Sequence, residues 1–158
     1  MTDYQKWRDF VFTVTPAQVG ISKTEPGKVY GVVMDVGLID QRSATEWALS
    51  LSVFSTGEAS LRPSVGGGAV GLGDEPKIAQ IAKEIVMLGH SLSSEASPTQ
   101  ETLIPQPGVI QFFFLSTNGL AVHREMMQTM QTPKNPFFPI LNRFAAIQQF
   151  ADQIAVKR

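Results

Sequence analysis

The chain has 158 residues, of which 43% are hydrophobic and 17% charged, and its formal net charge is -1 at pH 7. This size and composition are typical of one globular domain, so we expect a single domain over residues 1–158. The chain has no cysteine and only two histidines, which excludes a disulfide scaffold, a thiol nucleophile and a cysteine zinc site.

The lysines and arginines are scattered along the chain, unlike the basic stripe of nucleic-acid-binding proteins. No apolar run approaches the roughly 20 residues that a membrane span needs. The N-terminal stretch MTDYQKWRDF lacks the apolar segment of a signal peptide. We therefore expect a cytoplasmic protein that binds neither nucleic acid nor membrane and uses no metal or cofactor.

The first predicted element is a short helix, which Thr2 and Asp3 can cap. Its apolar side chains recur at helical spacing, and they are Tyr4, Trp7, Phe10, Val11 and Val14. Residues 10–14 also fit a strand, so that interpretation stays open. A turn-rich connector follows, over residues 15–28.

Three strands are predicted next, over residues 29–37, 45–54 and 59–62. The second strand has the clearest alternation of apolar and polar residues, with Trp47, Leu49, Leu51 and Val53 on one face. Asp35 interrupts the apolar first strand. It can pair with Arg62 or Arg124 across the sheet.

A long helix is predicted after the glycine-rich loop, because Asp74 suits an N-cap and Pro76 suits the first turn. Two further strands follow, over residues 109–116 and 120–125. They are joined by an Asn-Gly turn, which is a strong hairpin signal. The last helix is predicted to begin near Asn135 and Pro136.

The predicted element order is α-βββ-α-ββ-α. The simplest packing is a single α+β domain with one five-stranded antiparallel sheet and helices packed on it. This order resembles that of the bacterial secretion chaperones and of roadblock or profilin-like adaptor domains. The resemblance is one of outline over the whole chain, and it implies a chaperone-like or adaptor-like module.

The glycine-rich loop at residues 66–73 is a candidate ligand-binding segment, through Gly66, Gly67, Gly68, Gly71 and Gly73. Its first six residues match G-x-G-x-x-G, but they follow a hairpin strand rather than a βαβ strand. Asp74 and Glu75 would also repel a phosphate at the helix N-terminus. Two interpretations stay open, a structural joint and a flap that closes over a small molecule.

His123 and Glu125 share one face of a predicted strand, and such a pair can transfer protons. A solvated strand end is the favoured interpretation. No nucleophile motif accompanies the pair. The sequence therefore favours a protein that is not an enzyme, and we assign no catalytic residue.

A segment rich in methionine and phenylalanine supplies candidate partner-binding residues, namely Met126, Met127, Met130, Phe137 and Phe138. Methionine adapts to many binding surfaces, although filling of the core is an alternative role. The leading hypothesis is a non-catalytic interaction module, a homodimer that binds another protein. The alternative is a small-molecule-binding domain that uses the loop at 66–73 as a flap.

Overall fold

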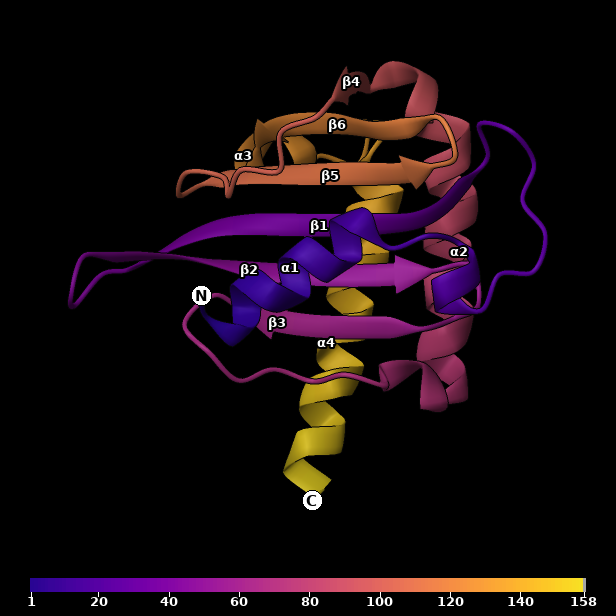
Figure 1. The fold of residues 1–158 in the computed structure, drawn as a ribbon. Coiled ribbons are helices and arrows are strands. Elements are labelled where there is room, and N and C mark those ends of the chain that lie inside the picture. The colour runs from indigo at the N-terminus through magenta and orange to yellow at the C-terminus, as the bar shows by residue number, and fades with distance from the viewer. Residues whose placement is uncertain (158) are drawn as a thin grey trace.

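The computed structural model describes the backbone of residues 1–157 and the side chains of residues 1–155. Its centre is an antiparallel sheet with the strand order β3-β2-β1-β5-β6-β4 (Figure 1). The strands are β1 (Val29–Asp40), β2 (Thr45–Phe54), β3 (Ala59–Pro63), β4 (Ser97–Thr99), β5 (Val109–Ser116) and β6 (Gly119–Met126).

The α+β class and the antiparallel sheet are confirmed, but the prediction of five strands is wrong, because the sheet has six. The extra strand is β4, which pairs with residues 120–122 of β6. Its three residues carry no alternating pattern. Pro98 has no N–H to donate, which an edge strand tolerates because one side of it needs no partner.

The helices are α1 (Asp3–Thr13), α2 (Pro76–Leu92), α3 (Met127–Met130) and α4 (Phe138–Lys157). Short 3₁₀ turns lie at Ala17–Val19, Leu72–Asp74 and Ser93–Glu95. A capping box fixes the start of α1, because Gln5 N donates to Thr2 Oγ1 at 3.1 Å and Thr2 N donates to Gln5 Oε1 at 2.9 Å. Residues 10–13 are therefore helical rather than part of a strand.

Helices lie on both faces of the sheet, which gives three layers (Figure 1). The main core lies between the sheet and the pair α2 and α4, around Phe112, Phe114 and Phe144. A smaller core lies under α1, where Val11 meets Phe113 and its neighbours. Each face of the sheet is thus one wall of a hydrophobic core.

Gly89 brings α2 close to the sheet. A Cβ at this position would lie 2.8 Å from Val32 Cγ2 and 3.1 Å from the Phe114 ring, which is nearer than side chains tolerate without rearrangement. The close approach fixes the last two turns of α2 over the start of β1.

The glycine-rich loop folds back along β3. Leu61 and Ala69 exchange two backbone hydrogen bonds of 2.8 Å. A Cβ on Gly68 would collide with the Leu61 carbonyl oxygen, and Gly68 has a φ of +114°. The loop therefore covers part of the outer edge of β3, an edge that would otherwise expose backbone groups.

Candidate functional site

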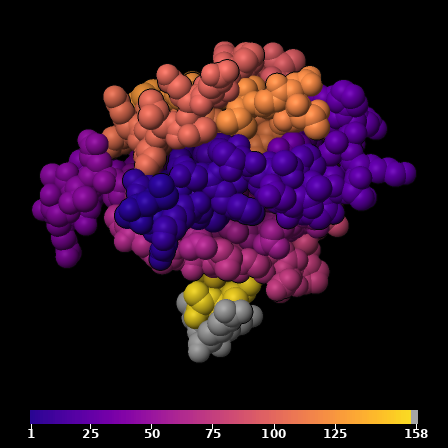
Figure 2. Space-filling view, in the orientation of Figure 1, coloured from indigo at the N-terminus to yellow at the C-terminus, as the bar shows by residue number. Residues whose placement is uncertain are grey.

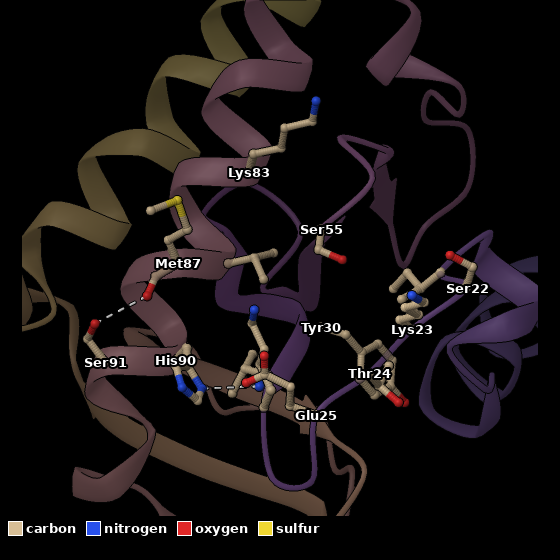
Figure 3. Close-up of a pocket in the computed structure, with 14 residues that line it drawn as sticks. Ser22, Lys23, Thr24, Glu25, Tyr30, Ser55, Lys83, Met87, His90 and Ser91 are labelled. Atoms are coloured by element: carbon tan, nitrogen blue, oxygen red, sulfur yellow. Dashed lines mark hydrogen bonds between the residues drawn. The ribbon is translucent and has the colours of Figure 1, made fainter.

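A hollow of about 1040 Å³ lies between α2 and the connector that precedes β1 (Figure 3). We call it the connector groove. One wall is residues 21–28 of the connector, and the other is the outer side of α2. The labelled α2 residues are Lys83, Met87, His90 and Ser91, and the labelled connector residues are Ser22, Lys23, Thr24 and Glu25. Ser55, at the end of β2, lies between the two walls.

Two hydrogen bonds flank the part of the connector that lines the groove. Ile21 N donates to the Pro16 carbonyl oxygen at 2.9 Å. Gly27 N donates to Thr117 Oγ1 at 2.9 Å, and its φ of +75° suits glycine. The stretch between these anchors is exposed and bridges the space beside α2.

The floor of the groove is apolar. Val29 is 2% exposed and Val86 is 4% exposed, and Met87 on the α2 wall is 72% exposed. Tyr30 adds its ring, while its hydroxyl donates to the Val14 carbonyl oxygen at 3.2 Å. Burial raises the pKa of Tyr30 above its ordinary value of 10.0, so the ring stays neutral.

The rim of the groove is predominantly cationic. Three lysines line it, Lys23 and Lys28 from the connector and Lys83 from α2, against the one carboxylate of Glu25. Within the part of the chain whose side chains are described, every ion pair lies elsewhere. The three ammonium groups therefore carry charge that no carboxylate among residues 1–155 neutralises at contact distance.

His90 contributes a hydrogen-bond donor to the groove. Its Nδ1 accepts a hydrogen bond from Val29 N at 3.3 Å. A ring nitrogen that accepts carries no proton, so this contact leaves Nε2 as the ring nitrogen that can donate.

A second polar cluster lies on the opposite face of the sheet, under α1. The strand register aligns Arg62, Ser50, Asp35, Gln111 and Arg124 in one row across five strands. Asp35 and Gln111 are both 0% exposed. The row is therefore an interior feature at its centre and reaches solvent at its ends.

Arg8 of α1 lies over the centre of this row. It donates to both carboxylate oxygens of Asp35, at 2.8 and 2.6 Å, and to the Thr102 carbonyl oxygen at 3.1 and 2.9 Å. Burial opposes the charge of Arg8, but its hydrogen bonds to Asp35 and the charge of that carboxylate hold the Arg8 pKa above its ordinary value. Ser50 and Gln111 also donate to Asp35, at 2.6 and 2.8 Å. The Asp35 carboxylate is thus saturated by its protein partners.

The candidate glycines lie along β3 and not at the connector groove. Gly68 and Gly73 pack closely on the backbones of Leu61 and Gly57, while Gly66 and Gly67 face open space. Gly71 adopts a φ of +68° just before the 3₁₀ turn. This packing is that of a structural joint, and the flap interpretation stays a prediction.

The methionine and phenylalanine segment is divided between the interior and the surface. Met130 is 0% exposed and Phe137 is 2% exposed, so both fill the core. Met127 is partly buried against the same core, and Phe138 is half-buried. Met126, at 54% exposed, is the member that faces solvent.

His123 and Glu125 do share a face and touch each other. His123 Nε2 lies 2.6 Å from Glu125 Oε2, and the imidazole stacks on the Phe137 ring with 3.7 Å between centroids. Asn135 Nδ2 donates to both Glu125 oxygens, at 3.0 and 3.1 Å. The cluster fastens the segment around α3 to β6, and neither His123 nor Glu125 lines the connector groove.

Among residues 1–155, no group of three or more metal-ligating side chains is found. None of the helices within the described backbone has the length and apolar character that crossing a membrane requires.

Comparison of the chain with protein-family models, with curated proteins and with solved structures finds no match. The functional argument therefore rests on the geometry of the chain itself.

Sequence reasoning missed the connector groove. Its residues fall in a segment predicted as a plain connector and on the outer side of a predicted helix. Two weak signals were present: Lys23 and Lys28 in the connector, and Met87 at a helix position outside the apolar stripe. Neither signal places the connector beside the helix.

Proposed function

We propose that the chain is a non-catalytic domain that binds a small molecule in the connector groove. The supporting observation is the combination, in one hollow of about 1040 Å³, of an apolar floor with ammonium, hydroxyl and imidazole groups at the rim. Small-molecule sites have volumes of roughly 300–1,000 Å³ and combine apolar walls with a few polar groups that fix orientation. The proposed ligand site is therefore at the connector and not at the glycine-rich loop, where the sequence suggested it.

The composition of the groove favours binding over catalysis. General acid–base and nucleophilic catalysis need a base oriented by a partner and placed beside a reacting group. Within the described residues, the hydrogen bond of the His90 ring goes to a backbone N–H and not to a carboxylate or hydroxyl. The one His–Glu pair lies outside the groove.

A tryptophan placed in the groove tests this proposal. Ser55 is exposed, and its side chain lies between the two walls, so Ser55→Trp should fill the space without disturbing the core. Ser43→Trp, at the exposed tip of the β1–β2 hairpin, is the matched control. Thermal-shift measurements with nucleotides, organic acids and amphiphiles would be compared for the three proteins.

We expect at least one ligand class to stabilise the wild type and the Ser43→Trp control but not Ser55→Trp. A ligand at about 100 times its Kd adds about 2.7 kcal/mol to the free energy of unfolding. An equal response of Ser55→Trp and the wild type would place the ligand elsewhere. No response to any class would remove support for the function.

A second candidate function is a homodimeric interaction module, and a different observation favours it. Four large apolar side chains are exposed at one end of the sheet, and we call them the hairpin-end patch. They are Ile39 at 46%, Leu103 at 67%, Ile104 at 47% and Met126 at 54% exposed. Exposed apolar side chains that gather in one place are a mark of interaction surfaces.

Backbone hydrogen bonds hold the members of the patch at one end of the molecule. Gly108 N donates to the Gly37 carbonyl oxygen at 3.0 Å, and Met127 N donates to the Gly108 carbonyl oxygen at 2.8 Å. These bonds join the end of β1, the segment before β5 and the end of β6. Figure 2 shows this face, with the β1–β2 hairpin projecting at the left and the segment around residue 100 above it.

The dimer prediction is tested with Leu103→Ser, which removes an exposed apolar side chain from the patch. Val65→Ser is the control, because Val65 is 70% exposed on the glycine-rich loop. By light scattering on a sizing column, we expect the wild type and Val65→Ser to be dimers and Leu103→Ser to dissociate. A monomeric wild type, or a Leu103→Ser dimer as stable as the wild type, would contradict this candidate.

A further inference from the structure

We infer that the connector groove takes an organic anion with an apolar body, of the class of the alkyl carboxylates and alkyl phosphates. This inference rests on the proposed small-molecule function and names the chemical class of its ligand. Three properties of the groove carry it: the charge of the rim, the donors of the rim, and the apolar floor.

The charge of the rim selects an anion. Lys23 and Lys28 approach from the connector and Lys83 from α2, so positive charge comes from both walls. The opposing charge among the lining residues is Glu25. The chain as a whole has a net charge of -1, so the groove is a local positive site on a nearly neutral molecule. Such a site attracts an anion and repels a cation.

The hydrogen-bonding groups of the rim point to the same class. Lysine ammonium groups donate and do not accept, and His90 has Nε2 left to donate because its Nδ1 accepts from Val29 N. Serine and threonine hydroxyls rotate to donate as well, and Ser22, Thr24 and Ser55 line the groove. A carboxylate or phosphate offers acceptors alone, and hydrogen bonds from charged donors to such groups are the strong ones.

The floor requires an apolar body next to the anionic head. Val29 and Val86 close the floor with apolar side chains, and Met87 on the α2 wall exposes 72% of its area. Methionine is flexible and packs against chains of irregular shape. An alkyl chain lying here would remove the Met87 side chain from water, which is favourable in proportion to the apolar area covered. Inorganic phosphate alone would leave this surface unused.

The experiment is a calorimetric titration with four monomeric amphiphiles that have linear alkyl chains of similar length and differ in the head group. Decanoate and decyl phosphate are the anions, decyltrimethylammonium is the cation, and octyl glucoside is neutral. We expect the anions to bind with one molecule per chain. The cation and the neutral amphiphile should bind at least about tenfold more weakly, which corresponds to about 1.4 kcal/mol. Added salt should weaken the binding of the two anions and leave the binding of the neutral amphiphile unchanged.

A charge-reversal variant locates the head group. Lys28→Glu combined with Lys83→Glu reverses one charge on each wall of the groove. We expect this variant to lower the affinity for decanoate by about tenfold or more. Lys6→Glu combined with Lys134→Glu makes the same change of net charge at exposed lysines outside the groove. That control should bind decanoate as the wild type does. Equal weakening in both variants would overturn the inference, because overall charge would then explain the effect.

Other outcomes separate the inference from the proposed function. Decyltrimethylammonium or octyl glucoside could bind as tightly as decanoate, with Ser55→Trp abolishing that binding. This result would overturn the inference that the ligand is an anion, while the proposed small-molecule function would stand. If neither these amphiphiles nor the wider ligand panel binds, both are overturned. Binding of the protein to phosphatidylglycerol vesicles is measured as well, because it distinguishes a protein that binds a lipid surface from one that binds a free anion. Binding to vesicles without binding of monomeric decanoate or decyl phosphate would overturn the inference.

Discussion

Asp35 and Arg8 form an ion pair that is almost fully removed from water. Their side chains are 0% and 7% exposed, and two charged hydrogen bonds join them. Arg8 also holds the Thr102 carbonyl oxygen. The pair thereby fastens α1 and the segment before β5 to the same point on the sheet.

Removal of the carboxylate should be costly, because Arg8 would remain buried without a counter-charge. We expect Asp35→Ala to lower the free energy of unfolding by about 3–5 kcal/mol, as broken buried ion pairs do. Asp9→Ala, at an exposed position of α1, is the control and should change stability by no more than about 0.5 kcal/mol. Urea denaturation of the three proteins measures both values.

The joint replacement Arg8→Met with Asp35→Leu gives a sharper check. It removes both charges and leaves apolar side chains in their place, and such replacements are often neutral. It should therefore recover most of the stability lost in Asp35→Ala. If Asp35→Ala lowered the free energy of unfolding no more than Asp9→Ala does, the ion pair would not be what holds α1 to the sheet.

Sequence reasoning identified Asp35 as exceptional but did not find its partner. The sequence offered Arg62 and Arg124 as partners across the sheet without indicating burial, and both do lie in the same row as Asp35. Arg8 nevertheless takes the contact, because α1 crosses the sheet directly above Asp35. The direction in which a helix crosses a sheet depends on tertiary packing and is not encoded in local periodicity.

At the scale of elements, the glycine-rich loop offers a matched pair of glycines. Gly66 and Gly68 both have a φ of +114°, but a Cβ at Gly66 meets nothing within 4 Å, whereas one at Gly68 collides with the Leu61 carbonyl oxygen. The two alanine variants therefore share the backbone strain and differ in the collision. We expect Gly68→Ala to be less stable than Gly66→Ala by about 1–3 kcal/mol, which is the usual cost of overpacking.

Thermal or urea denaturation of the two variants measures this difference. A smaller stability for Gly68→Ala supports the loop as a joint that pairs with β3. Equal stabilities would mean that the contact between Leu61 and Ala69 contributes little, and the loop would then be free to act as a flap.

The regular elements were predictable where the periodicity was long. The strands expected at 45–54 and 109–116 have those bounds, because alternation or an unbroken apolar run extends over the whole element. β1 continues three residues beyond its expected end, to Asp40, as one arm of a projecting hairpin. β4 and α3 were missed, since elements of three or four residues carry no period to detect.

At the scale of the whole molecule, both outer edges of the sheet are poor templates for another strand. The glycine-rich loop pairs with β3, and the opposite edge is β4, which has three residues and contains Pro98. Covered edges and short edge strands disfavour association by strand addition. A dimer, if formed, is therefore expected to use the hairpin-end patch rather than a sheet edge.

The candidate site also belongs to this scale, which is why the sequence did not predict it. The connector groove joins a segment before β1, the end of β2 and the outer side of α2. These residues meet because Gly89 brings α2 against the sheet and because Thr117 anchors the connector from another hairpin. Each contact is between residues far apart in the chain, so no local sequence pattern predicts the groove.

The proposed binding site of an amphipathic anion is the connector groove and not the hairpin-end patch. The most direct test is a titration of the methionine-labelled protein with decanoate, followed by methyl NMR. Met87 lines the groove and Met126 belongs to the patch, and both are exposed. We predict that the Met87 methyl signal shifts and saturates while that of Met126 stays in place. A shift of Met126 without one of Met87, or no shift of either, would contradict the claim.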